Sequence, residues 1–167
     1  GALRQFITTS PMNRRTVDTI NAKGRLASSR LGGLDTAVFS YDARGRLSKL
    51  QQGARFVSLA YNPKGQLATI RNALSQTTSY EYDLAGRMTK QTLPDGRFVS
   101  YAYDSMGNLS SLTPPGKTAH KLVFNVLGQM VTFDPPILVA TTNYKTQYSY
   151  NADKELAKIL RPDGKSI

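Results

Sequence analysis

The stretch YDARGRL, residues 41–47, recurs along this chain, and its recurrence decides the fold. The first residue of each copy, here called its leader, is Ile20, Tyr41, Tyr61, Tyr82, Tyr103, Phe124 or Tyr150. The steps between leaders are 21, 20, 21, 21, 21 and 26 residues, so the period is 21 with one insertion. A fixed period of this length indicates a repeat architecture in which one supersecondary unit is copied.

Each copy carries the residues of a turn directly after its leader. The position after the leader holds Asn21, Asp42, Asn62, Asp83, Asp104, Asn125 or Asn151, and three residues later stand Gly24, Gly45, Gly65, Gly86, Gly107, Gly128 and finally Lys154. An Asp or Asn side chain closes such a turn by accepting a backbone hydrogen bond from two residues on, and glycine takes the positive φ that follows. Every Asp-x-x-Gly segment is therefore predicted to be a hairpin corner. Lys154 must either adopt a left-handed conformation, at about 1 kcal/mol, or change the turn.

A second kind of corner lies between the copies, at LPDGR (93–97), TPPGK (113–117) and RPDGK (161–165). Proline sets φ at the first central position of these turns, and glycine again follows. Two turns in 21 residues leave about six residues for each of two strands, close to the usual strand length. The spacing predicts a continuous antiparallel meander of hairpins.

The segments before the first corner alternate apolar and polar residues, as in RFVSLAYN (55–62) and RFVSYAYD (97–104). This period of two indicates strands, with Val57, Leu59 and Tyr61 on one face. After the corner the apolar residues are three apart, as in Leu47 and Leu50, which also fits a helix. The gap between corners is too short for an ordinary helix, so strand is favoured. Either a bulge or a sheet partly covered on both faces would explain the offset.

Residues 80–109, YEYDLAGRMTKQTLPDGRFVSYAYDSMGNL, resemble the YD repeats of the RHS family, whose usual form is Y-x-Y-D-x-x-G-R-L followed by a P-D-G turn. The resemblance covers about residues 20–167. It implies an all-β fold, a hairpin meander that forms an open, spiralling YD-repeat sheet as part of a shell. Such shells occur in bacterial toxin complexes, polymorphic toxins and teneurins, where they enclose a toxic or folded C-terminal segment or act in adhesion. Seven copies are too few to close a large shell, and Asp153 and Asp163 stand in turns, unlike the family's self-cleaving aspartates.

The resemblance divides the chain into a lead-in or edge cap, residues 1–19, and seven repeats, residues 20–167, with an insertion near 134–146. Structural repeat positions are assigned to Tyr41, Asp42, Gly45, Leu47, Tyr61, Asn62, Gly65, Leu67, Tyr82, Asp83, Gly86, Met88, Tyr103, Asp104, Gly107, Leu109, Phe124, Asn125, Gly128, Tyr150 and Asn151. The apolar run 137–140 in the insertion favours a longer hairpin over a segment that packs on a neighbour. Uncapped strand edges predict self-association or coverage of one edge by residues 1–19. A propeller with two copies per blade is the less favoured alternative, because its connections would alternate in length.

The charge of +11 and a pI near 10.0 favour anionic partners. Arg25, Arg46 and Arg87 hold the same place in their copies, and would stack as a ladder along one rim, which makes them candidate anionic contacts. The favoured interpretation is that they keep exposed edges soluble. Specific nucleic-acid binding is not expected, because the tyrosines stand on the apolar stripe and not on a base-stacking platform.

Nothing in the sequence indicates catalysis, so no enzyme activity and no cofactor or metal is predicted. His120 is the single histidine, and neither a metal-binding nor a phosphate-binding loop is present. No cysteine and no apolar run long enough for a transmembrane helix is found. The predicted function is a non-catalytic structural segment of an RHS/YD-repeat shell that encloses or presents a C-terminal toxin or effector. The alternative is a cell-surface module that binds an anionic glycan or surface through the basic rim.

The expected partners are the remainder of a larger RHS-type polypeptide or its cargo. The chain begins with GAL and not with Met, which favours an excised fragment. The expected location is secreted or at a bacterial cell surface, as part of a larger exported protein.

Overall fold

The computed structural model describes residues 3–136 and 144–167, and within these ranges the regular secondary structure is all β. The strands are β1 (Arg4–Thr9), β2 (Arg15–Ile20), β3 (Leu26–Leu31), β4 (Ala37–Tyr41), β5 (Leu47–Gln52), β6 (Arg55–Tyr61), β7 (Leu67–Asn72), β8 (Thr77–Tyr82), β9 (Met88–Thr92), β10 (Phe98–Tyr103), β11 (Leu109–Thr113), β12 (His120–Phe124), β13 (Met130–Asp134), β14 (Thr146–Tyr150) and β15 (Leu156–Leu160). They pair in chain order, β1 to β15, in one open antiparallel sheet. The predicted meander is confirmed, and the propeller, which needs separate blades, is wrong.

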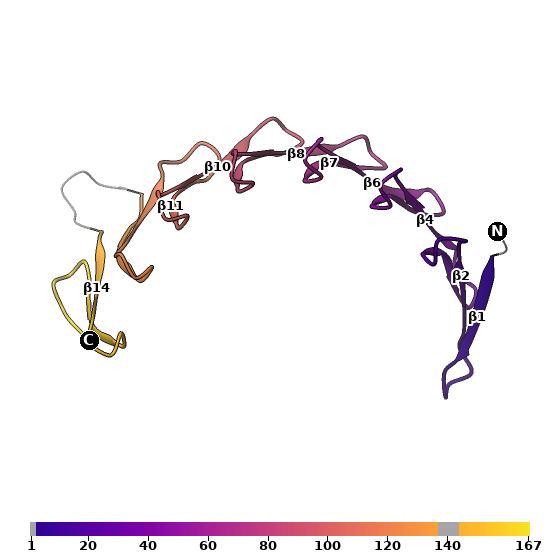
Figure 1. Ribbon diagram of the computed structural model, residues 1–167, viewed down its shortest axis with the longest axis horizontal. Helices are drawn as coiled ribbons and strands as arrows, with labels where there is room; N and C mark the ends of the chain where they lie inside the picture. Colours follow the sequence, from indigo (N-terminus) through magenta and orange to yellow (C-terminus); the bar gives the residue numbers. More distant parts are fainter. Residues whose placement is uncertain (1–2, 137–143) are drawn as a thin grey trace. The chain divides into compact units, whose positions relative to one another are not determined.

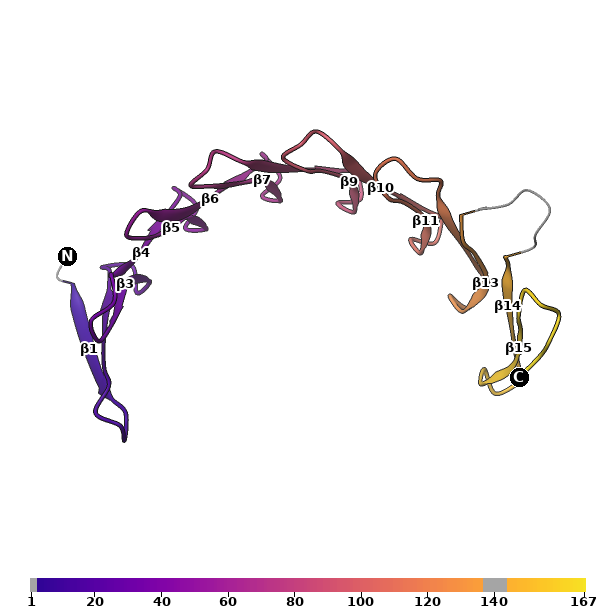
Figure 2. The same cartoon turned by 180° about the vertical axis from the view of Figure 1, so that it is seen from behind.

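The chain divides into two compact units, Gly1–Ser79 and Tyr80–Ile167. In the first unit, β1 to β7 and the start of β8 lie side by side in chain order (Figure 1). In the second unit, β9 to β15 repeat the same arrangement (Figure 2). Each strand therefore packs mainly against the strands directly before and after it in the sequence, as expected of a repeat protein.

A β-bulge next to the leader explains the apolar residues that are three apart. Tyr41 lies opposite Leu47 and Ser40 lies opposite Lys49, which leaves Ser48 as the extra residue. The same register shift occurs next to the leaders Ile20, Tyr61, Tyr103, Phe124 and Tyr150. Because the bulge adds one residue, positions three apart on the second strand point to the same face of the sheet. The bulge interpretation is confirmed, and the helical interpretation of this spacing is wrong.

The sheet has two different faces, because side chains alternate along a strand and paired residues share a face. The face that carries the leaders is here called the tyrosine face. In the first unit it holds Phe39, Tyr41, Leu47, Leu50, Val57, Leu59, Tyr61, Leu67 and Ile70. In the second unit it holds Tyr101, Leu112, Leu122, Phe133, Tyr148 and Ile159.

The described residues form a single layer without a conventional core. No hydrophobic side chain in residues 3–136 and 144–167 is buried, and the side chains of the tyrosine face are mostly half-buried against one another. Turn residues such as Leu84 and Val126 are 94% and 84% exposed. Stability therefore comes from strand pairing, from contacts along the tyrosine face and from the corners, since no second layer is available to bury apolar area.

The lead-in, residues 1–19, contains β1 and most of β2, and the insertion lies between β13 and β14. β1 pairs along its whole length with β2, from Arg4 opposite Ile20 to Thr9 opposite Arg15, so part of the lead-in is itself a strand. The insertion joins β13 to β14, and Lys145 forms an ion pair of 3.6 Å with Asp134 at its base. The apolar run 137–140 falls within residues 137–143, outside the described residues. The longer hairpin therefore stays a prediction, as does the division into domains.

Candidate functional site

Each Asp-x-x-Gly corner is closed by the same backbone hydrogen bonds. At residues 42–46 the N–H of Asp42 donates to the carbonyl of Arg46, and the N–H of Gly45 donates to the carbonyl of Asp42, both at 2.9 Å. This pair of bonds recurs in all seven copies. Gly45 has a φ of 82°, and Lys154, which replaces the glycine in the last copy, has a φ of 67°. The predicted hairpin corners are confirmed, and of the two alternatives for Lys154 the structure has the left-handed conformation with the turn retained.

The side chain that opens each corner bonds further along the turn than the sequence predicts. In all seven copies its Oδ1 accepts a hydrogen bond from the N–H four residues on, at 2.8–3.0 Å. The expected bond from two residues on is also made, for example at Asn21, Asp104 and Asn125, at 2.9–3.0 Å. The Asp or Asn therefore ties both arms of the hairpin together.

The first and fifth residues of the corner are also matched to each other through their side chains. Where the first residue is Asp, the fifth is a donor: Arg46 for Asp42, Arg87 for Asp83 and Asn108 for Asp104, at 2.7–2.9 Å. Where the first residue is Asn, its amide donates to an acceptor, at 2.8–3.0 Å: Gln66 for Asn62, Gln129 for Asn125 and Glu155 for Asn151. Asn21 and Arg25 do not fit this rule, because the Asn21 side-chain NH2 and the Arg25 guanidinium are both donors.

The ionised form of the corner aspartates is stabilised by these contacts. The pKa of Asp42 is lowered, first by the hydrogen bond from the Arg46 N–H and then by the Arg46 guanidinium, with partial opposition from desolvation. The pKa of Asp83 is lowered in the same way by Arg87. The pKa of Asp104 is lowered mainly by the side-chain hydrogen bond from Asn108. These carboxylates are thus acceptors within the turn, and they are poor candidates for proton transfer near neutral pH.

A second set of contacts joins neighbouring repeats through the hydroxyl of a tyrosine leader. The hydroxyl of Tyr61 donates to the carbonyl of Leu47 at 2.8 Å, six residues after the preceding leader. The equivalent bonds run from Tyr41 to Leu26, from Tyr103 to Met88 and from Tyr150 to Met130, at 2.8–2.9 Å. The contact region between two neighbouring repeats is here called a joint. Phe124 occupies the leader position but has no hydroxyl, so the joint between its repeat and the preceding one lacks this bond. The leader therefore acts as a clasp between neighbouring hairpins.

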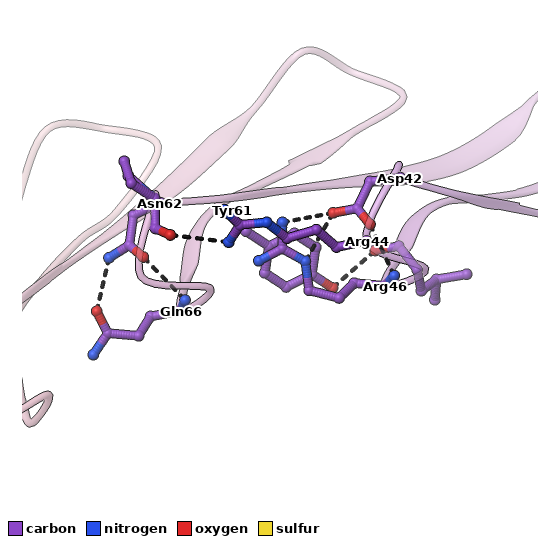
Figure 3. A network of polar contacts seen from close by, with 8 residues as sticks. Asp42, Arg44, Arg46, Tyr61, Asn62 and Gln66 are labelled. Carbon is purple, nitrogen blue, oxygen red and sulfur yellow. Dashed lines mark hydrogen bonds and ion pairs between the residues drawn. The ribbon is translucent and has the colours of Figure 1, made fainter.

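The rim arginines cover the same joints. The guanidinium carbon of Arg46 lies 4.1 Å from the ring centroid of Tyr61, the next leader (Figure 3). Arg25 lies over Tyr41 at 5.5 Å, and Arg87 lies over Tyr103 at 4.6 Å. Arg25 also lies so close to Gly45 that an added Cβ would overlap its guanidinium. These arginines therefore pack between repeats. The positive φ of Gly45 is what requires glycine at this corner, since the end of the flexible Arg25 side chain could move aside.

The corners of neighbouring repeats also touch directly. Arg44 donates from Nη1 to the carbonyl of Pro63 at 2.9 Å, and a shallow hollow between the two corners is lined by Asp42, Arg46 and Asn62 (Figure 3). In the second unit Gln129 donates from Nε2 to the carbonyl of Lys154 at 2.8 Å. At these two joints the polar contacts between corners thus help to fix the position of one hairpin relative to the next.

The structure separates the predicted site residues into different roles. The leaders, the corner Asp or Asn and the glycines meet at the joints, but the arginines do not form an uninterrupted ladder, because neutral Gln66 stands at the equivalent place between repeats. Arg46 and Arg87 already have carboxylate partners, in ion pairs of 2.6 and 2.7 Å. Their role as anionic contacts stays a prediction. The fifth corner position was missed, although its matching to the first position is readable from the seven copies.

Catalytic chemistry has no evident centre in the described part of the chain. His120 stacks on Phe133 with ring centroids 5.9 Å apart, which is a packing role. Residues 3–136 and 144–167 contain no group of three or more potential metal ligands. The described ranges also contain no helix with the length and apolarity needed to cross a bilayer.

Comparisons with known proteins agree with this repeat structure. The family description that matches is the teneurin YD-shell, over residues 14–167. A search of curated proteins gave no match. Among solved structures, the Tc holotoxin pore of Photorhabdus luminescens superimposes with a TM-score of 0.67 and 22% identity, covering 88% of this chain and 9% of that chain. The TcdB2-TccC3 complex has a TM-score of 0.67 and 20% identity, with 91% and 10% covered.

The TcdB2-TccC3-Cdc42 structure gives the same TM-score with 19% identity, and covers 88% of this chain and 9% of that chain. The chain thus spans about a tenth of the length of these solved chains, and the likeness to them concerns the fold. The resemblance to YD-repeat shells is confirmed by the family match, which covers all seven repeats. This chain belongs to the teneurin YD-shell family.

Proposed function

We propose that this chain is a non-catalytic wall segment of a larger YD-repeat shell that encloses or presents a toxin or effector. The observation that carries the proposal is the tyrosine face: it is apolar and continuous within each unit, and no second layer in the described residues covers it. A free-standing domain would bury such a face in its own core. A wall that lines a container can instead cover it with the enclosed polypeptide.

The joints support the same role. Tyrosine clasps of the same design link neighbouring repeats in both units, so the sheet extends by adding hairpins. The proposed setting is a secreted or cell-surface protein in which this chain is a fragment of the shell. The alternative, a module that binds anions through Arg25, Arg46 and Arg87, has less support, because two of these arginines are paired with aspartates.

Photo-crosslinking in the parent polypeptide tests the proposal. Phe39 lies on the tyrosine face, while its neighbour Val38 lies on the opposite face and is 46% exposed. p-Benzoylphenylalanine is introduced in place of either residue, and crosslinked peptides are identified by mass spectrometry. We expect the probe at position 39 to crosslink to a segment outside the repeats, and the probe at position 38 to give no such product. Absence of crosslinks at both positions, or equal crosslinking, would overturn the proposed enclosure on the tyrosine face.

A further inference from the structure

A hollow of about 250 Å³ lies on the tyrosine face of the first unit, where β5 ends and β6 begins. Ala37 lies opposite Gln52, and Gln52 lies opposite Arg55, so the three residues form one cross-strand row. Arg55 is two residues from Val57, and the row therefore belongs to the tyrosine face. The small side chain of Ala37 leaves the space above the row open. The hollow is lined by Ala37, Leu50, Gln52, Arg55, Phe56 and Val57.

The lining of this hollow changes from apolar to polar. Leu50 and Val57 are half-buried and supply an apolar wall. Gln52 and Arg55 are exposed, and both also line a second hollow, of about 460 Å³, which is completed by Leu34, Asp35 and Ala54. The two hollows adjoin, because they share two lining residues. Together they are here called the Arg55 groove.

The turns on either side of the Arg55 groove are held together. Gln52 donates from Nε2 to the carbonyl of Asp35 at 2.9 Å, which ties the turn after β5 to the turn before β4. The Asp35 carboxylate lies next to Gly53, and it forms no ion pair within the described ranges. The polar end of the groove therefore presents one acidic and one basic side chain.

The guanidinium of Arg55 has no carboxylate partner in residues 3–136 and 144–167. The second unit repeats the segment RFVS at residues 97–100, with Arg97 in the place of Arg55. Arg97 donates from Nε to Oδ2 of Asp95 at 2.7 Å. The same segment thus holds a paired arginine in the second unit and an unpaired one in the first.

The apolar wall is also particular to the first unit. Val57 lies opposite Leu50, so two apolar side chains face the hollow. Val99, which is equivalent to Val57 in the second RFVS segment, lies opposite the polar Gln91. The combination of an unpaired cation with an apolar wall is therefore not a consequence of the repeat design.

We propose that the Arg55 groove binds the carboxyl-terminal residue of a polypeptide, with an apolar side chain against the wall and the α-carboxylate on Arg55. A guanidinium binds a carboxylate through two parallel charge-assisted hydrogen bonds, and the wall removes the apolar side chain from water. The carboxylate of Asp35 accepts a main-chain N–H of the bound segment. The proposal rests on the proposed function for the source of this terminus, which is the enclosed polypeptide.

A terminal residue fits this groove better than an internal acidic residue. Consecutive side chains of an extended segment point to opposite faces, so an internal acidic residue and its apolar neighbour would not both reach the groove. A terminal residue carries the carboxylate and the apolar side chain on one Cα. The hollow beside the wall is smaller than the pockets of about 300–1,000 Å³ that hold drug-sized ligands, which suits a single side chain.

Peptide binding to the 167-residue chain tests the proposal, with NMR titration as the measurement. The probe is acetyl-Gly-Ser-Gly-Leu with a free carboxyl end, and it is compared with its carboxyl-terminal amide, with acetyl-Gly-Ser-Gly-Ser and with free leucine. Arg55→Gln removes the guanidinium, and Arg97→Gln is the matched control in the second RFVS segment. Leu50→Gln introduces the side chain that the second unit has at the wall position. Far-ultraviolet circular dichroism checks that the variants keep the β fold.

We expect the leucine-ended acid to bind best. The amide and the serine-ended peptide should each bind at least about threefold more weakly, since one loses the ionic contact and the other the apolar contact. Arg55→Gln should abolish the preference for acid over amide, whereas Arg97→Gln should keep it. Leu50→Gln should abolish the preference for leucine over serine. These preferences are first measured on the unaltered chain, so the test does not depend on the folding of a variant.

Equal binding of acid and amide by the unaltered chain would overturn the proposal, as would absence of binding. A preference that survives in Arg55→Gln, or that is lost equally in Arg97→Gln, would overturn the role of Arg55. Tighter binding of free leucine than of the peptide would overturn the choice of a polypeptide terminus.

The peptide experiment and the crosslinking experiment can fail separately. Peptide binding that depends on Arg55, without crosslinks from position 39, would support the groove and overturn the enclosure. Crosslinks from position 39 without peptide binding would support the enclosure and overturn the groove.

Discussion

The hydroxyl of Tyr61 donates a hydrogen bond of 2.8 Å to the main-chain carbonyl of Leu47, in the preceding repeat. This bond connects Tyr61, the last residue of β6, to Leu47, the first residue of β5. Both residues lie next to an Asp-x-x-Gly corner. It uses a carbonyl next to the β-bulge, where the regular strand ladder is interrupted. The tyrosine leader thus contributes its ring to the tyrosine face and its hydroxyl to a hydrogen bond between repeats.

Removal of this hydroxyl should weaken the joint measurably. We expect Tyr61→Phe to lower the free energy of unfolding by about 1 kcal/mol, because a partly buried hydrogen bond is lost while the ring is kept. Urea unfolding followed by circular dichroism measures the change. Tyr101→Phe is the matched control, since the Tyr101 hydroxyl has no hydrogen-bond partner within the described ranges. A control loss as large as that of Tyr61→Phe would contradict the clasp.

The reciprocal change restores a missing clasp. Phe124 is a leader without a hydroxyl, and the carbonyl equivalent to that of Leu47 belongs to Leu109 in the preceding repeat. Phe124→Tyr should raise the free energy of unfolding by up to about 1 kcal/mol if the new hydroxyl reaches this carbonyl. The same urea titration detects it. A destabilised variant would show that the joint at Phe124 differs in geometry from the others.

The matching of the first and fifth corner positions predicts a specific double-mutant cycle. Asp42→Asn alone places an amide donor against the Arg46 guanidinium, and Arg46→Gln alone removes the donor from Asp42. Each single variant should lower the urea midpoint. The double variant reproduces the native Asn62–Gln66 pair and should recover most of the loss. Additive losses in the double variant would show that the matching carries no energetic coupling.

The same pair predicts a contribution to acid stability. The pKa of Asp42 is lower in the folded chain than its ordinary value, so the stabilisation is fully present above about pH 4 and is lost as the pH falls through the lowered pKa. We expect the stability of the Asp42→Asn/Arg46→Gln variant to fall less between pH 5 and pH 2 than that of the wild type. Chemical unfolding at a series of pH values measures this. Parallel pH profiles would contradict the assigned pKa direction.

The last corner carries a conformational strain that glycine would relieve. Lys154 has a φ of 67°, in the left-handed region, where the other copies have glycine. Lys154→Gly should raise the free energy of unfolding by up to about 1 kcal/mol. Asp153→Gly, at the preceding turn position, is the control and should bring no gain. Thermal unfolding distinguishes the two, and equal effects would argue against strain at Lys154.

Much of the fold could be read from the residues themselves, because its determinants are local. The period of the leaders, the Asp-x-x-Gly corners and the alternation in residues 55–62 act within a few residues of chain, and they specify hairpins in sequence order. The fifth corner position was also readable, since Asp42 with Arg46 and Asn62 with Gln66 already display the matching.

The tertiary structure decided what depends on strand register. The spacing of Leu47 and Leu50 admitted two interpretations, and only the pairing of Tyr41 with Leu47 established that a bulge places both on one face. Register also brings Arg46 over Tyr61 and aligns Lys49 with Arg71, which are 15 and 22 residues apart in sequence. Such relationships follow from cross-strand hydrogen bonds, and a one-residue slip would send these side chains to the other face. The repeat pattern in the sequence therefore determines the hairpins. The cross-strand register determines which residues meet at the joints and which face of the sheet each side chain occupies.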